Sequence, residues 1–209
     1  MSIPVERTIK CPKCGETLKF TMWESINTMI PFAREDIISG KLFEVKCRSC
    51  GQTTRVVYPI LFNDLEHQVM IHYVPPERVD TVLDSVKIIA RMGSRARVVT
   101  SVNELREKAM IFESNLDDRV IEVQKLIAMR QVKNQLGGEK IQAMFFNTEG
   151  NPRFEMDVDG QGGYVPLNMD DYAELKEAMS PSFESLEDEY CINGEWAETY
   201  LASLEEDDE

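Results

Sequence analysis

Alternation of apolar and polar residues dominates the first 75 positions and predicts β-structure there. Residues 17–23 (TLKFTMW) alternate with the period of two that a strand requires. Pro31 precedes a short helical pattern, FAREDIIS, which Gly40 closes at the C′ position. Three further segments have strand composition, KLFEVKC, TTRVVYPILF and HQVMIHYV, and the turn-forming pair Asn63 and Asp64 separates the last two. We therefore expect an antiparallel β unit with a short inserted helix over about residues 1–75.

A helical period replaces this alternation between residues 76 and 136. A first helix over about residues 76–93 aligns Val79, Val82, Val86 and Ile89. Ser101 and Glu104 form a capping box before the next apolar run. Asp117 or Asp118 then caps a long helix that Gly137 and Gly138 end. This helix has two apolar stripes. The second stripe would be explained either by burial within the chain or by a homodimer interface.

The remaining residues predict a small α+β region over 138–180. KIQAMFFNT and RFEMDV have strand patterns, YVPL follows, and Asp171 caps a helix that ends before Ser180 and Pro181. Between the strands, Asp157, Asp159 and Gly162 take positions 1, 3 and 6 of an EF-hand loop, but position 12 is Asn168 where a bidentate Glu is required. A glycine-rich hairpin turn explains this segment better than calcium, and ion binding by Asp157 and Asp159 stays open.

The fold class that follows is α+β. A zinc-ribbon-like antiparallel β unit with an inserted helix (about 1–75) and a helical part (about 76–136) make one domain, 1–136. The small α+β region (138–180) and an acidic tail (181–209) come after it.

Charge is distributed unevenly over these regions. The chain carries a net charge of −14, yet residues 1–60 contain nine Lys and Arg against six Asp and Glu. From Ser180 to Glu209 there are eleven acids and no bases. Acidic blocks of this kind are mostly solvated tails that aid solubility, and some bind a basic partner.

Composition limits the setting of the protein. The sequence contains no run of about 18 apolar residues, so no membrane span is expected. The first ten residues, MSIPVERTIK, lack the apolar core of a secretory signal. We therefore expect a cytoplasmic protein, where a reducing environment favours thiols and metal sites over disulfides.

The most specific chemistry lies in two hooks, CPKCG at 11–15 and CRSCG at 47–51. Thiolates at this spacing bind a metal through two tight turns, and the glycine after each pair permits the positive φ that such a turn needs. Four sulfurs in a tetrahedron suit Zn²⁺ and leave no position open, so the expected ion is a structural zinc. The proposed ligands are Cys11, Cys14, Cys47 and Cys50. Iron in a rubredoxin-like site uses the same sulfurs, and a thioredoxin-type redox motif fits less well, because strand-like residues follow each hook.

The paired hooks, together with ESINT at 24–28, LFEVKC, YPILF, MIHYVPP and SVNELREKAMIFESNLDDRVIEVQK, resemble the CpXC family over roughly residues 9–130. The resemblance implies a zinc-ribbon β unit followed by helices in a bacterial cytoplasmic protein. It implies no activity. The four cysteines match position by position, with Arg48 in the second hook where the first has Pro12.

The other candidate groups have simpler explanations. Helix capping explains Asp117, Asp118 and Arg119 better than catalysis does. A phosphate-binding patch of Lys87, Arg91, Arg95 and Arg97 lacks interleaved aromatic residues. We expect solvent-facing or hydrogen-bonded roles for His67 and His72, and a free thiol at Cys191.

Three functions remain open. The first is a non-enzymatic module with a structural zinc that binds a protein partner, with the acidic tail as one contact. The second is a nucleic-acid binder that uses the basic N-terminal part, and the third is an enzyme whose site assembles only in the fold.

Overall fold

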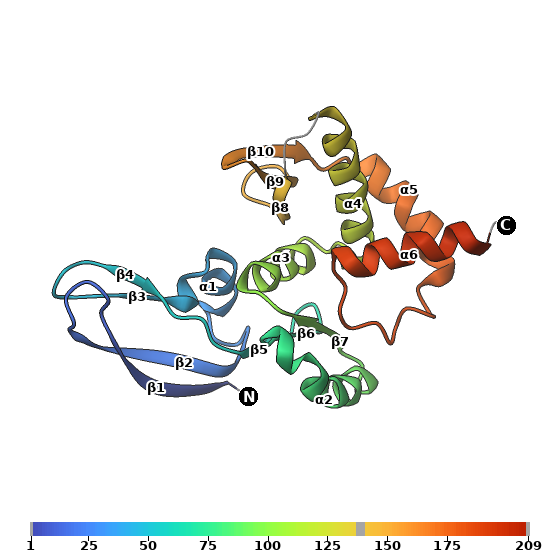
Figure 1. The fold of residues 1–209 in the computed structure, drawn as a ribbon. Helices are drawn as coiled ribbons and strands as arrows, with labels where there is room; N and C mark the ends of the chain where they lie inside the picture. The colour runs from blue at the N-terminus through green and yellow to red at the C-terminus, as the bar shows by residue number, and fades with distance from the viewer. Residues whose placement is uncertain (1, 137–140, 208–209) are drawn as a thin grey trace. The chain divides into compact units, whose positions relative to one another are not determined.

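The computed structural model describes residues 2–136 and 141–207 and confirms the expected α+β class (Figure 1). The chain divides into two compact units, Met1–Ala109 and Met110–Glu209, and each is described by itself. The boundary expected near residue 136 falls inside the second unit.

The first unit is built on a five-stranded sheet in the order β1-β2-β5-β6-β7. Its strands are β1 (Ile3–Lys10), β2 (Thr17–Asn27), β5 (Ile60–Asp64), β6 (Val69–Tyr73) and β7 (Arg95–Val99). The β1–β2 and β5–β6 pairs are antiparallel, whereas β2–β5 and β6–β7 are parallel. The sheet is therefore mixed, and the expected antiparallel arrangement holds within its hairpins. Asn63 and Asp64 pair with β6 rather than form the turn, which moves to residues 65–68.

A separate two-stranded hairpin contains the second cysteine hook. Its strands are β3 (Glu44–Lys46) and β4 (Thr53–Arg55). Before it, α1 (Ala33–Ser39) ends at Gly40, whose φ of 81° confirms the predicted left-handed cap. The 3₁₀ turn η1 (Lys41–Phe43) follows, so the strand expected over KLFEVKC is shorter than its composition indicates. The expected strand TTRVVYPILF is also interrupted, because residues 56–59 separate β4 from β5.

One strand of the first unit was not predicted from the sequence. The connection from β6 contains η2 (Pro76–Arg78) and α2 (Val79–Arg91) and returns as β7, parallel to β6. In the sequence, the two arginines of RARVV resemble the basic residues that are common at the end of a helix. Arg97 is in fact 3% exposed and donates from Nη1 to the carbonyl of Ala96 at 2.8 Å. Its burial breaks up the phosphate-binding patch considered from the sequence.

Helix α3 (Val102–Glu113) starts with the predicted cap. The hydroxyl oxygen of Ser101 accepts the N–H of Glu104 at 3.1 Å. The Glu104 carboxylate accepts the N–H of Thr100 at 2.8 Å, one residue further back than a standard capping box.

An aromatic cluster of Phe20, Phe43, Tyr58 and Tyr73 joins the elements of the first unit. Ring centroids lie 5.5 Å apart for Phe20–Tyr58, 5.1 Å for Phe43–Tyr58 and 6.4 Å for Phe43–Tyr73. Tyr58 donates its hydroxyl to the Leu42 carbonyl at 3.3 Å, and burial raises its pKa to about 12. Because the four residues come from β2, η1, the 56–59 segment and β6, this cluster fixes the two cysteine-bearing hairpins to one core.

The second unit places a three-stranded antiparallel sheet beside three helices. The strands are β8 (Ile141–Asn147), β9 (Arg153–Val158) and β10 (Gln161–Pro166), in the order β10-β9-β8. The helical elements are α4 (Asp118–Gln135), α5 (Met169–Met179), η3 (Ser180–Ser182) and α6 (Gly194–Asp207). Phe146 and Phe154 meet edge to face in the core at 6.3 Å.

Helix α4 is the centre of the second unit. It packs against α5, α6 and β8, so partners within the chain cover more than one side of the helix. Its N-cap is Asp117, as expected, whereas α5 is capped by Asn168 rather than by Asp171. The helix end expected at Gly137 and Gly138 lies outside the described residues.

The described part of the acidic segment is folded and is not a solvated tail. Tyr190, Ile192, Ala197 and Tyr200 are each no more than 8% exposed. The Asn193 side chain accepts the N–H of Trp196 at 2.9 Å at the start of α6, which packs on α4. These apolar residues hold the segment against the rest of the unit. A count of charged residues alone does not reveal them.

Removing one ring of the aromatic cluster tests its importance. Because Phe43 is fully buried and contacts Tyr58 and Tyr73, Phe43→Ala is expected to lower the free energy of unfolding by about 3–5 kcal/mol in urea denaturation. Val57→Ala is the control, since Val57 is 55% exposed and its truncation should cost less than about 0.5 kcal/mol. Equal losses from both variants would contradict a core centred on Phe43.

Candidate metal centre

Each cysteine hook closes a β-hairpin. The first joins β1 to β2 where Lys10 pairs with Thr17, and the second joins β3 to β4 where Lys46 pairs with Thr53. Figure 1 shows the two hairpin ends beside each other in the first unit. The hooks therefore come from different sheets and meet at their tips.

The two turns have the same internal geometry. The N–H of Cys11 donates to the Glu16 carbonyl at 2.8 Å, and the N–H of Gly15 donates to the Cys11 carbonyl at 2.9 Å. The second hook repeats both bonds at 2.8 and 2.9 Å, from Cys47 to Gln52 and from Gly51 to Cys47. Both glycines have a φ of 74°, which a residue with a side chain rarely adopts. Arg48 in place of Pro12 leaves this geometry intact.

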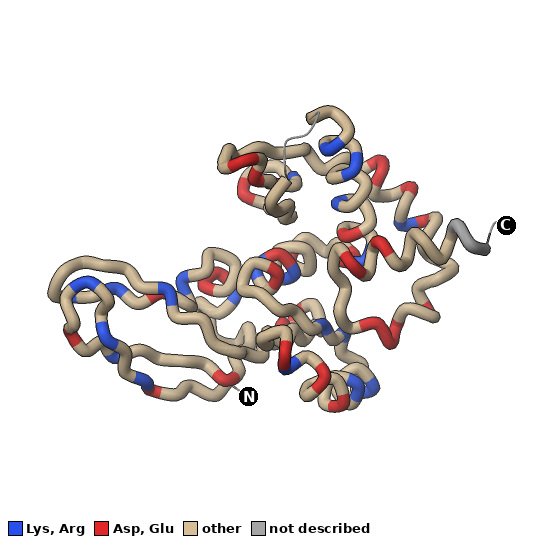
Figure 2. The backbone as a smooth tube through the Cα atoms, viewed as in Figure 1, with Lys and Arg blue, Asp and Glu red and all other residues tan. Residues whose placement is uncertain are grey.

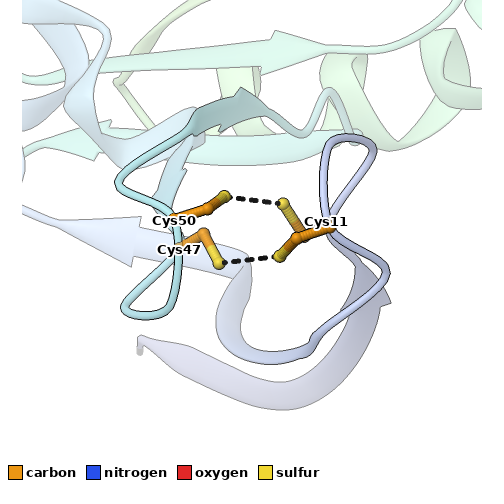
Figure 3. Close-up of side chains that lie close together, drawn as sticks. Cys11, Cys47 and Cys50 are labelled. Atoms are coloured by element: carbon orange, nitrogen blue, oxygen red, sulfur yellow. Dashed lines mark hydrogen bonds between the residues drawn. The ribbon is translucent and has the colours of Figure 1, made fainter.

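The four sulfur atoms converge on one point. All of them lie within 4.8 Å of one another, and the closest pairs run between the hooks, Cys11–Cys50 at 3.6 Å and Cys14–Cys47 at 3.7 Å (Figure 3). A tetrahedron of sulfurs with Zn–S bonds of about 2.3 Å has edges of about 3.8 Å. A disulfide would need about 2.05 Å, and all five cysteines are free thiols. The spacing fits one four-coordinate metal ion.

Electrostatics explains why such a cluster favours a cation. The N–H groups of Cys14 and Lys13 face the Cys11 sulfur and, against the effect of burial, lower its pKa to about 7. The N–H of Glu16 lowers the pKa of Cys14, but the neighbouring sulfurs, Cys50 first, together with desolvation raise it to about 12. A positive charge between the sulfurs would offset this repulsion, so the cluster favours binding of a metal cation.

Access to the site is one-sided. Cys11 and Cys47 are 2% and 1% exposed, whereas Cys14 is exposed and Cys50 is half-buried. Four protein sulfurs would fill the coordination sphere of a tetrahedral ion, so neither substrate nor water has a position on it.

Comparison with known proteins identifies the family. The family described as "CpXC protein" matches residues 9–125, more than half of the chain, and the match includes both hooks. The chain belongs to the CpXC family. No curated protein and no solved structure matches the chain. The family match extends past β7 and α3 into α4, so these elements belong to the CpXC region together with the hooks.

The remaining candidates from the sequence do not belong to the cluster of four sulfurs. His67 is hydrogen-bonded, with Nδ1 2.8 Å from the Asp64 carboxylate. His72 lies in β6, its Nε2 is buried without a hydrogen-bond partner, and burial lowers its pKa. Cys191 is half-buried. In residues 2–136 and 141–207, the hooks are the one group of His, Cys, Asp and Glu with metal-binding geometry.

Asp117 and Arg119 have a structural role. The Asp117 carboxylate accepts from Nε of Arg119 at 3.0 Å and from Nη2 at 2.7 Å. The guanidinium lies 4.0 Å from the Phe183 ring centroid and donates to the Phe183 carbonyl at 3.2 Å. This arrangement connects the start of α4 to the segment after η3. On the next turn of α4, Lys125 and Glu122 form a buried ion pair at 2.9 Å.

Asp157 and Asp159 belong to the turn between β9 and β10. The Asp157 carboxylate accepts the N–H of Gly160 at 2.7 Å, and Asp159 and Gly160 have φ values of 48° and 83°. Positive φ at both central residues defines a type I′ hairpin turn, the structure favoured over a calcium loop from the sequence.

A polar cluster of Arg34, Asp64, Glu66 and His67 was not found from the sequence. Arg34 donates from Nη2 to Asp64 at 2.9 Å and to Glu66 at 2.8 Å. The Asp64 carboxylate also accepts the N–H groups of Glu66 and His67. Burial alone would raise the pKa of Asp64, but the hydrogen bonds from His67 and Arg34 lower it below its usual value. Arg34 lies in α1, 30 residues from Asp64, so no local motif announces the cluster.

Acidification should remove the contribution of Asp64. A carboxyl whose pKa is lower in the folded state stabilises the fold above its unfolded pKa of about 3.9, and this contribution disappears as the pH falls through the folded value. Asp64→Asn is therefore expected to destabilise the protein at pH 7 by about 1–3 kcal/mol in urea denaturation, and the difference from wild type should shrink below about pH 4. The control is Glu66→Gln, because Glu66 binds the same arginine with a side chain 69% exposed. A difference that persists unchanged at pH 2–3 would contradict an ionised Asp64.

Proposed function

We propose that this CpXC protein holds one structural zinc ion on Cys11, Cys14, Cys47 and Cys50 and acts by binding a partner protein. The observation that carries the zinc site is the convergence of four sulfurs within 4.8 Å of one another. When bound, the ion supplies positive charge and four coordinate bonds, and the chain supplies two matched turns that orient the thiolates.

A binding role agrees with the chemistry of the site better than catalysis does. Saturated coordination leaves the ion without a position for a reacting group. The site joins two hairpins of one unit, so its consequence is a fixed surface around the hooks. Exposed thiolate-rich sites survive in reducing surroundings, which favours a bacterial cytoplasmic protein, as the family resemblance implies. Among the described residues, no helix has the combination of length and hydropathy that spanning a bilayer requires.

Metal analysis of the protein purified without chelators tests the zinc site. We expect one zinc per chain by elemental mass spectrometry and a tetrahedral thiolate spectrum after replacement by cobalt. Cys47→Ser should lose the metal and much of the stability of the first unit, because a structural zinc contributes about 10–16 kcal/mol of binding free energy in small zinc folds. Cys191→Ser is the matched control and should keep both. Iron at this stoichiometry, or a wild type whose stability does not change when the metal is removed, would overturn the proposal.

Nucleic acid is the second candidate partner, and the surface charge around the hooks favours it. Lys10, Lys13, Lys46 and Arg48 are exposed next to the cysteines, and Figure 2 shows basic residues at this end of the two hairpins. The first unit contains 16 Lys and Arg against 13 Asp and Glu, a net charge of +3.

Salt dependence separates this candidate from protein binding. If phosphates are the ligand, the affinity for a DNA or RNA duplex falls steeply between 50 and 200 mM salt, as expected from roughly one released counterion per neutralised phosphate. Lys13→Glu combined with Arg48→Glu should then abolish the band shift, whereas Lys176→Glu in the second unit should not change it. Absence of a salt-sensitive shift would exclude nucleic acid as the partner.

A further inference from the structure

The five-stranded and the three-stranded sheet each have an edge strand, β1 and β10, and the two strands differ in how they discourage pairing with other chains. Strand β1, at one edge of the five-stranded sheet, has the sequence IPVERTIK, with a proline and three charged residues. Prolines and charges on an edge strand discourage pairing with other chains. Strand β10, at one edge of the second sheet, has the sequence QGGYVP, with no charged residue. The feature of β10 that discourages such pairing is Pro166, at the end of the strand.

Hydrogen bonding identifies the groups that β10 presents at its edge. The N–H of Leu167 donates to the Pro152 carbonyl at 3.0 Å, which continues the register in which Gly163 pairs with Met156. Odd-numbered residues therefore bond to β9. The backbone groups of Gly162 and Tyr164 point to the opposite side, because hydrogen-bonding directions alternate along an antiparallel strand. In the part of the chain that the structure describes, no strand pairs with that side of β10.

The face of the sheet beside this edge is open. A Cβ added at Gly162 would have no heavy atom within 4 Å, so the sheet surface at this residue is not covered. A cavity of about 730 Å³ lies beside the strand, with Pro152, Met156 and Pro166 among its lining residues. Tyr164, which is 65% exposed, also lines this cavity, and the Arg153 guanidinium lies 5.9 Å from its ring. Backbone groups at the edge and a side-chain pocket beside it are the two parts of strand addition.

The charge around β10 indicates which kind of peptide strand would pair with it. Glu155 and Asp157 on β9 lie directly opposite Tyr164 and Gly162. Within the β9–β10 hairpin the base is Arg153, which is already paired with Glu155 at 2.6 Å. Figure 2 shows acidic residues along this hairpin, and the second unit has 24 Asp and Glu against seven Lys and Arg, a net charge of −17. Such a surface repels nucleic acid and acidic peptides and attracts basic ones.

We propose that β10 binds a basic, extended peptide segment of a partner protein as a fourth strand of this sheet, with a side chain of the peptide in the cavity beside Tyr164. This inference deepens the proposed function and rests on its protein-binding part, because it names the surface and the partner class. It does not depend on the zinc ion.

The experiment uses the full chain with its metal and a library of eight-residue fluorescent peptides. The peptides have Lys or Arg at alternating positions and varied residues between them. Binding is followed by fluorescence anisotropy, and amide NMR shifts report its location. We expect basic peptides to bind with shifts at residues 161–166 and to weaken as salt rises. Peptides with Glu at the alternating positions should not bind. Equal binding of acidic peptides, or no binding by any basic member, would overturn the proposal.

Two substitutions of one glycine test the edge itself. Gly162→Pro removes an N–H that β9 does not use, so it should leave the sheet intact. It should weaken binding about tenfold, through the loss of one hydrogen bond to the peptide and the obstruction by the proline ring. Gly162→Ala keeps that N–H and should bind within about twofold of wild type. Wild-type affinity in the proline variant would overturn the inference.

Two further outcomes separate the alternatives. If Gly162→Pro does not fold by circular dichroism, backbone N-methylation of the peptide replaces it, since methylating one alternating set of residues should abolish binding and the other set should not. A wild-type dimer that Gly162→Pro dissociates would assign the edge to a second copy of the chain and overturn the basic partner. If the Gly162→Pro variant still binds a native partner protein as the wild type does, this inference is overturned, whereas the proposed function is not.

Discussion

Four sulfur atoms on two hairpins of separate sheets must stay within 4.8 Å of one another, and this requirement organises the first unit. The pairs that approach most closely are 39 and 33 residues apart in the chain. Closing a loop of that length costs about 3 kcal/mol in its length-dependent part alone. A structural zinc, which contributes about 10–16 kcal/mol in small zinc folds, would exceed this cost several-fold. Without a cation the thiolates would repel each other, so the convergence needs a second source of order.

The aromatic cluster supplies that order. Phe20 lies on β2, Phe43 immediately precedes β3, and Tyr58 contacts both rings. The N–H of Val56 also donates to the Phe43 carbonyl at 2.7 Å, which fixes the chain leaving β4 to the chain entering β3. Apolar packing therefore sets the position of the hairpins, and their tips bring the cysteines together. A metal would strengthen an arrangement that the core already specifies, so the core and the ion reinforce each other.

The sequence predicts the parts of this arrangement that local chemistry determines. The matched hooks with their glycines, the cap at Gly40 and the Asp117 cap all depend on residues a few positions apart, and the structure contains each of them. Features that depend on distant partners were missed. Strand β7 was mistaken for a basic helix end because the burial of Arg97 is decided by its surroundings in the fold. The cluster of Arg34, Asp64 and His67 likewise joins α1 to the end of β5, 30 residues away, and to the turn that follows it.

The acidic C-terminal segment shows how composition alone misleads. Eleven acids without a base from Ser180 onward predict a solvated tail, yet four well-spaced apolar residues, Tyr190, Ile192, Ala197 and Tyr200, are enough to bury one side of it. The acids within residues 184–198 are exposed on a folded unit rather than on a flexible extension. Fixed charges attract a ligand with a defined orientation, whereas a flexible tail attracts it without one. Because β10 belongs to the same unit, its uncharged edge lies in a part of the protein with a strongly negative net charge. A negative field raises the local concentration of basic segments. The outer edge of β10 has backbone N–H and C=O groups with no neighbouring strand in the described residues, whereas the backbone groups between the strands of the sheet are already paired.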